Sequence, residues 1–173
     1  PGTGYSTRDN DDLAALPAQA GMIGEFLDKL GVDKPILVGH SLGGALALAM
    51  ALQRREKIGA LALLSPLTAV NAEPPAVFKP LVVRSKFLRR LIGHVIAVPI
   101  TKLTSGRVVA EVFAPEQAPG DFMVKGGGIL GLRPGSFIAA SADLHGVMQS
   151  LPEQVARYKA ELSVPGGVLF GAD

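Results

Sequence analysis

The stretch that decides the fold is ILVGHSLGGALALAM, residues 36–50. Ile36, Leu37 and Val38 form a short apolar run without polar alternation, which predicts a strand buried on both faces of a parallel sheet. Residues 42–55 are rich in alanine and leucine, and they predict a helix that packs closely through small residues. Because a serine flanked by glycines separates the two, the stretch predicts a strand, a tight turn and a helix.

The neighbouring segments continue this alternation of helix and strand. Residues 17–30 carry apolar side chains at nearly helical spacing, and they begin with a proline that suits the first turn of a helix. Gly31 is a plausible cap at the other end. Residues 60–64 predict a second buried strand. The first third of the chain therefore predicts an α/β repeat around a parallel sheet.

The pattern changes after residue 66 and returns near the end of the chain. Residues 67 to about 135 are rich in proline and glycine. The sequence SLPE at 150–153 matches a capping box, which predicts a helix to about Leu162. Residues 164–170 predict another core strand. We therefore expect part of a core at 1–66, an inserted segment at 67–149 and a return to the core at 150–173.

Composition limits the class of protein and its partners. Of 173 residues, 48% are hydrophobic and 18% charged, which favours one folded domain over disorder. A net charge of +2 is too weak to indicate a nucleic-acid partner. Without cysteine there is no CxxC metal site, and the redox compartment cannot be inferred. No apolar run reaches the roughly 18 residues expected of a transmembrane helix.

Gly39-His40-Ser41-Leu42-Gly43 matches the pattern G-x-S-x-G of a nucleophile elbow. Such a turn holds its serine in a sparsely allowed backbone conformation, and the two glycines are expected to remove side chains that would collide. The hydroxyl then lies at the carboxyl edge of the sheet, where open α/β sheets bind ligands. The following helix points its positive end there, which places the Leu42 N–H to stabilise an oxyanion.

Two other interpretations of this turn are open. Ser41 could cap the helix in an ordinary glycine-rich turn, or the glycines could form a phosphate-binding loop. The second is weak, because the segment lacks both G-x-x-x-x-G-K-[ST] and G-x-G-x-x-G. The strand before Ser41 and the small-residue helix after it favour a nucleophile.

Four segments resemble successive parts of the α/β-hydrolase fold family, in its serine-nucleophile branch: GYSTR (4–8), ILVGHSLGGALALAMAL (36–52), LSP (64–66) and VPGGVLFGAD (164–173). The resemblance implies an eight-stranded, mostly parallel sheet with a helical cap inserted after the sixth strand. It also implies that Ser41 is the nucleophile and Leu42 the backbone donor. Members resembling haloalkane dehalogenases and epoxide hydrolases carry aspartate at the elbow. Serine instead favours hydrolysis of esters, thioesters, amides or carbon–carbon bonds through an acyl-enzyme.

The catalytic triad that this family implies is incomplete in the sequence. The acid follows the strand expected at 164–170, either at Asp173 or just beyond it, and Asp173 is alternatively a loop residue beside the true acid. The histidine is expected later still, and the second oxyanion donor before Pro1. His94 and His145 are expected in the cap. We therefore expect both ends to be internal to a larger domain, and residues 1–173 alone to be inactive.

These features predict a serine hydrolase of the esterase or lipase type that acts on a small apolar acyl substrate without a metal or cofactor. A carbon–carbon bond hydrolase or a perhydrolase of the same fold is an alternative. A non-catalytic relative used for binding is the alternative from a different class.

The inserted segment also carries a basic stripe. Between residues 79 and 107 there is no acidic residue, and the basic ones are Lys79, Arg84, Lys86, Arg89, Arg90, Lys102 and Arg107. Apolar residues alternate with them, which predicts an amphipathic cap helix with a solvated basic face. The other interpretation is a helix that makes a weak membrane-surface contact with anionic lipid or presents a lipid substrate. The absence of tryptophan argues against the second interpretation.

Overall fold

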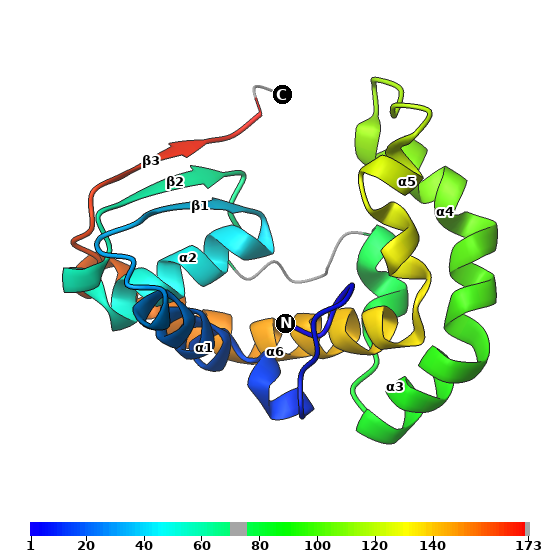
Figure 1. Cartoon of the computed structure of the whole chain (residues 1–173), viewed down its shortest axis with the longest axis horizontal. Helices are drawn as coiled ribbons and strands as arrows, with labels where there is room; N and C mark the ends of the chain where they lie inside the picture. Colours follow the sequence, from blue (N-terminus) through cyan, green and yellow to red (C-terminus); the bar gives the residue numbers. More distant parts are fainter. Residues whose placement is uncertain (70–75, 172–173) are drawn as a thin grey trace. The chain divides into compact units, whose positions relative to one another are not determined.

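The computed structural model describes residues 1–69 and 76–171 (Figure 1). The chain divides into two compact units. The sheet unit comprises Asp12–Ala72 and Gly146–Asp173, and the helical unit comprises Pro1–Asp11 and Glu73–His145. These boundaries differ from the expected ones at the start of the chain, where residues 1–11 group with the helical unit.

Three parallel strands form the sheet, in the order β1-β2-β3. They are β1 (Ile36–His40), β2 (Ala60–Leu64) and β3 (Gly166–Leu169). All three lie where the sequence predicted strands, and both neighbouring pairs are parallel. The prediction of an α/β fold around a parallel sheet is therefore confirmed for these strands.

Two helices of the sheet unit follow the predicted pattern. They are α1 (Leu16–Lys29) and α2 (Leu42–Gln53), and they confirm the helices expected at 17–30 and 42–55. Gly31, just after α1, has a φ of 66°, which suits a glycine at the end of a helix. Short 3₁₀ turns precede α1 at Asp11–Ala14 and follow α2 at Arg55–Lys57.

The core of the sheet unit lies on one face of the sheet. Figure 1 shows α1, α2 and the last part of α6 (Pro134–Glu161) on the same side of the three strands. Apolar side chains from these helices and from β2 fill the space between: Leu16, Leu48, Met50, Leu61, Leu63, Val147 and Leu151. This packing fixes the strand–turn–helix segment around Ser41.

The prediction that the first strand is buried on both faces is wrong for the residues described. Ile36 is 68% exposed and Val38 71% exposed. Side chains alternate between the two faces of a strand. Helices cover only the face of the sheet on which Leu61 and Leu63 lie. The expected core strand at the end of the chain is likewise exposed along all of β3. An apolar run without alternation predicted the strands but not how many layers cover them.

The capping box expected at 150–153 is also wrong, because α6 begins at Pro134 and runs through these residues. The hydroxyl of Ser150 donates to the carbonyl of Gly146 (2.7 Å) and accepts from the backbone N–H of Leu16 (3.2 Å). It therefore ties α6 to α1 instead of starting a helix. Pro152 lies inside the helix.

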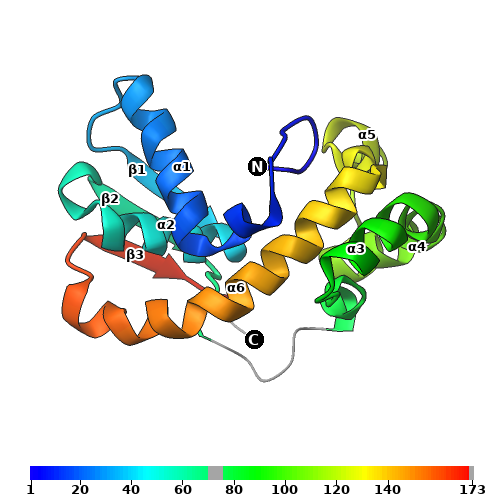
Figure 2. The same ribbon diagram turned by 90° about the horizontal axis from the view of Figure 1, so that it is seen from below.

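The helical unit has little regular layering. It contains α3 (Lys86–Ile92), a π-helical turn (Gly93–Ala97), α4 (Val98–Phe113), α5 (Phe122–Lys125) and 3₁₀ turns at Ala76–Leu81 and Gly128–Leu132. Figure 2 shows α3 and α4 beside the first part of α6. The rings of Phe113 and Phe122 pack edge to face, with their centroids 4.8 Å apart. Within residues 1–69 and 76–171, no helix has the length and apolar character needed to cross a membrane.

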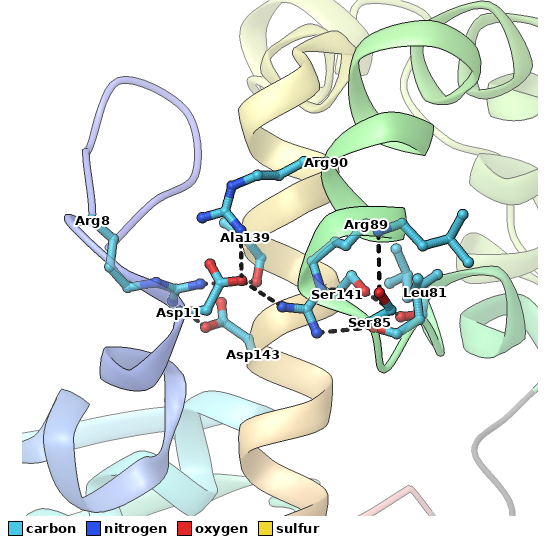
Figure 3. Close-up of polar contacts among 11 residues, drawn as sticks. Arg8, Asp11, Leu81, Ser85, Arg89, Arg90, Ala139, Ser141 and Asp143 are labelled. Atoms are coloured by element: carbon cyan, nitrogen blue, oxygen red, sulfur yellow. Dashed lines mark hydrogen bonds and ion pairs between the residues drawn. The ribbon is translucent and has the colours of Figure 1, made fainter.

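A buried arginine holds the helical unit together (Figure 3). Arg89 is 1% exposed, and its guanidinium donates to Asp11 (2.7 Å), to the hydroxyl of Ser141 (3.1 Å) and to the carbonyl of Val83 (2.9 Å). The expectation of a solvated basic face is therefore wrong for Arg89. The carboxylate of Asp11 draws this side chain inside, because a buried cation needs a charged partner.

Candidate active site

Ser41 lies in the turn between β1 and α2, with φ 52° and ψ −119°. Sterics make this region of φ and ψ sparsely populated for residues other than glycine, at a cost of about 1–3 kcal/mol. Such a conformation persists only where its surroundings impose it. The sequence predicted a strained serine at this turn, and the structure has one.

Backbone hydrogen bonds hold the Ser41 peptide from two sides. Its N–H donates to the carbonyl of Leu64, at the end of β2 (3.2 Å). Its carbonyl oxygen accepts from the N–H groups of Gly44 (3.0 Å), Ala45 (3.3 Å) and Leu67 (2.9 Å). The first turn of α2 and the segment after β2 therefore fix the strained residue together.

Close backbone approach explains two of the glycines around Ser41. A Cβ atom on Gly39 would lie 2.5 Å from the carbonyl oxygen of Gly43, and one on Gly44 would lie 2.4 Å from the Cβ of Pro66. A Cβ on Gly43 would meet no described atom within 4 Å. The expectation that a side chain at Gly43 would collide is thus wrong, since this residue is exposed on the first turn of α2. Gly44 is the glycine that lets α2 pack closely.

We expect Gly39→Ala to destabilise the protein by about 1–3 kcal/mol, because the added methyl group meets backbone atoms that cannot rotate away. Gly43→Ala is the matched control, and it should shift the free energy of unfolding by less than about 0.5 kcal/mol. Chemical denaturation of the two variants measures the difference. Equal destabilisation by both substitutions would contradict the packing argument.

Within the described part of the chain, the hydroxyl of Ser41 makes no hydrogen bond that stabilises the fold. Ser41 occupies the position before α2, yet its side chain makes no capping hydrogen bond. The residue is exposed, and the Leu42 N–H beside it donates to none of the described backbone acceptors. A serine that only capped the helix would bond to a backbone N–H of the first turn. This geometry therefore speaks against the capping alternative.

A buried glutamine of α6 forms a hydrogen bond to the backbone of α2. Gln154, on α6, donates through Nε2 to the carbonyl of Ala45 (2.8 Å) and to the hydroxyl of Tyr158 (2.8 Å). Burial raises the pKa of Tyr158, and the hydrogen bond from Gln154 lowers it by a smaller amount. Nothing in the sequence pattern singled out Gln154, because glutamine is common on exposed helix faces. Only the long-range packing of α6 on α2 reveals its contact.

Of the other predicted site residues, Gly39, His40, Leu42 and Gly43 adjoin Ser41 in the same strand–turn–helix segment. Asp173 lies outside the described residues. His40, the last residue of β1, is exposed and is the only histidine among the described residues of the sheet unit. His94 and His145 belong to the helical unit, and Nδ1 of His94 lies 2.8 Å from the carbonyl oxygen of Arg90. Within the described ranges, no three His, Asp or Glu side chains cluster in a way that could hold a metal ion.

Comparisons with known proteins agree with this geometry. A family profile described as alpha/beta hydrolase fold matches residues 1–93. Human monoglyceride lipase is 32% identical over 92 residues, which is 51% of this chain and 30% of the lipase. Haloalkane dehalogenase 2 of Mycobacterium tuberculosis is 27% identical over 103 residues, which is 53% of this chain and 36% of that enzyme.

Solved structures show the same fold. Epoxide hydrolase A from Mycobacterium thermoresistibile superposes with a TM-score of 0.64 at 17% identity, covering 99% of this chain and 64% of the hydrolase. The chain thus spans less than two thirds of each of these three relatives. Since the profile covers more than half of the chain, and the strand, serine turn and helix stand in the expected order, the chain belongs to the α/β-hydrolase fold family.

Proposed function

We propose that this chain carries the nucleophile of a serine hydrolase, which acts on an ester or related acyl substrate through an acyl-enzyme at Ser41. The observation that carries the proposal is the serine turn itself. A non-glycine residue is held at φ 52° and ψ −119°, and its hydroxyl makes no capping bond. Backbone strain combined with an unused nucleophilic side chain is typical of functional sites.

In the proposed mechanism, the Ser41 Oγ attacks the carbonyl carbon of the substrate, and a histidine of the intact protein takes the hydroxyl proton. The negative charge that develops on the carbonyl oxygen faces the Leu42 N–H and the positive end of α2. The histidine then returns the proton to the leaving group, and water hydrolyses the acyl-enzyme. A carboxylate orients the histidine, and Asp173 is the candidate in this sequence.

The identity of the residue at the elbow favours acyl chemistry over the chemistry of the epoxide hydrolases and haloalkane dehalogenases that the chain resembles. Those relatives, by the family pattern, carry aspartate at this position, where this chain has Ser41. A serine alkoxide attacks acyl carbons and leaves an ester intermediate that water can cleave. We assign the helical unit the role of the cap, with a small apolar acyl compound as the substrate and no metal or cofactor.

A fluorophosphonate probe tests the proposal in the full-length protein. The activated Oγ displaces fluoride from phosphorus, so we expect one covalent adduct, mapped to Ser41 by peptide mass spectrometry. Ser41→Ala should abolish labelling. Ser65→Ala is the matched control, because Ser65 also has a positive φ (39°) and also follows a strand, and this variant should label normally.

The same experiment separates the alternatives. A full-length protein that is folded but does not react would favour the non-catalytic relative used for binding. Labelling at another residue would also overturn the assignment of Ser41. A carbon–carbon bond hydrolase or a perhydrolase would label at Ser41, and these would then be separated from an esterase by their substrates.

A further inference from the structure

An unusually exposed helical stretch lies in the helical unit. α3, the π-helical turn and α4 follow one another without a break from Lys86 to Phe113 (Figure 1). Half of the 16 residues of α4 are apolar, and none of the 16 is buried. Helices of folded proteins normally bury an apolar stripe against a neighbour. α4 leaves most of its apolar side chains exposed to solvent.

The exposed apolar side chains form two rows along this stretch. Those at 87, 91 and 95 repeat every four residues, and those at 96, 100 and 103 continue at spacings of four and three, so each row follows one helix face. Phe87 is 78% exposed and Leu103 is 85% exposed. The α3–α4 surface consists of Phe87, Leu91, Val95, Ile96, Ile100 and Leu103.

Basic side chains outnumber acidic ones along α3 and α4, where Glu111 near the end of α4 is the one acid. Residues 76–110 contain seven basic side chains and no acidic one. Arg89 is turned inward to Asp11, whereas Arg84, Lys102 and Arg107 are exposed. Arg107 follows Leu103 by four residues, which places it on the same face of α4. The apolar rows are therefore flanked by cations.

We propose that the α3–α4 surface docks on a membrane that contains anionic lipid. Such a membrane offers both kinds of contact: an apolar boundary for Phe87 and Leu103, and a negative surface for the flanking cations. The charge excess favours this partner over a second copy of the chain, which would bring its own cations to the same place. The helices lie in the interface and do not span it. The proposal is independent of the chemistry assigned to Ser41.

Flotation with lipid vesicles tests the proposal on the full-length protein. We expect binding to vesicles with about one third phosphatidylglycerol, little binding to pure phosphatidylcholine, and release in about 0.5 M salt. Replacing Arg84, Lys102 and Arg107 by glutamine should weaken the partition about 100-fold. Phe87→Ser with Leu103→Ser should weaken it by a similar factor. Ser41→Ala should bind like the wild type, which separates this test from that of the proposed function.

Matched controls carry the same changes elsewhere. Phe26→Ser removes an exposed aromatic side chain from α1, and glutamine at Lys29, Arg55 and Lys159 removes three exposed cations from the sheet unit. Both controls should bind like the wild type. Equal loss in the controls, or equal binding to neutral vesicles, would overturn the proposal. The proposal would also be overturned if the protein did not bind vesicles but self-associated, and Leu103→Ser dispersed the oligomer. A second copy would then cover the α3–α4 surface.

Discussion

Replacing Ser41 by alanine is expected to lower kcat/KM for a short-chain p-nitrophenyl ester by at least about 10⁴-fold in the full-length protein. The substitution removes the attacking oxygen, and what remains is binding and the stabilisation offered by the Leu42 N–H. Stability should change little. The Ser41 side chain makes no capping hydrogen bond, so the variant loses none. Alanine also carries a Cβ atom, so the backbone strain at φ 52° stays the same. We expect a shift in the melting temperature within about 2 °C.

Steady-state kinetics and thermal unfolding of the same preparations check this prediction. Ser65→Ala is the control for a second serine with positive φ, and it should keep kcat/KM within about threefold of the wild type. The assignment fails if Ser41→Ala turns over the ester at the wild-type rate. A large loss of stability in Ser41→Ala would instead mean that the hydroxyl has a structural role.

The sequence predicted the segments whose local pattern is strong. β1, α2 and β2 were found because apolar runs, small residues and a glycine-flanked turn occur next to one another, and these patterns depend on few long-range contacts. The strained backbone at Ser41 was predicted from the same turn. The match over residues 1–93 to the alpha/beta hydrolase fold covers this strongly patterned part.

The features that the sequence did not predict depend on packing between distant segments. An apolar strand has the same sequence pattern whether helices cover one face of its sheet or both. The pattern therefore did not predict that Ile36 and Val38 are exposed. Gly43 and Gly44 are adjacent glycines, and the local sequence does not distinguish them. Only the position of Pro66 shows that Gly44 is the one that must lack a side chain. Ser150 resembled a helix cap because the pattern cannot show that its hydroxyl bonds to α1.

Arg89 is the clearest case of a residue whose role the sequence concealed. It stands in a run of basic residues, yet the structure buries it against Asp11, 78 positions away. The carboxylate of Asp11 is itself only 9% exposed. The exposed Arg90 lies farther from it, at 3.5 Å. Arg89 thus neutralises a nearly buried charge and joins residues 1–11 to α3 and α6.

Arg89→Met is therefore expected to destabilise the protein by about 3–5 kcal/mol, because it leaves the Asp11 carboxylate without its buried partner. At roughly 2–4 °C per kcal/mol for a chain of this size, the melting temperature should fall by about 10 °C. Arg90→Met is the matched control. Its side chain is half exposed, so we expect a change of at most about 1 kcal/mol.

A double-mutant cycle identifies the cause. Removing both charges, with Asp11→Asn and Arg89→Met, should cost less than the sum of the two single changes, because no uncompensated charge then remains inside. Hydrogen exchange should locate the loss in the amides of α3, which Arg89 anchors through the carbonyl of Val83 and the hydroxyl of Ser141. If Arg89→Met and Arg90→Met proved equally mild, or if the two changes were additive, the ion pair with Asp11 would not be what stabilises the helical unit. A non-additive result would show that a charge pair distant in sequence holds the N-terminal segment against the helix that begins the proposed membrane-docking stretch.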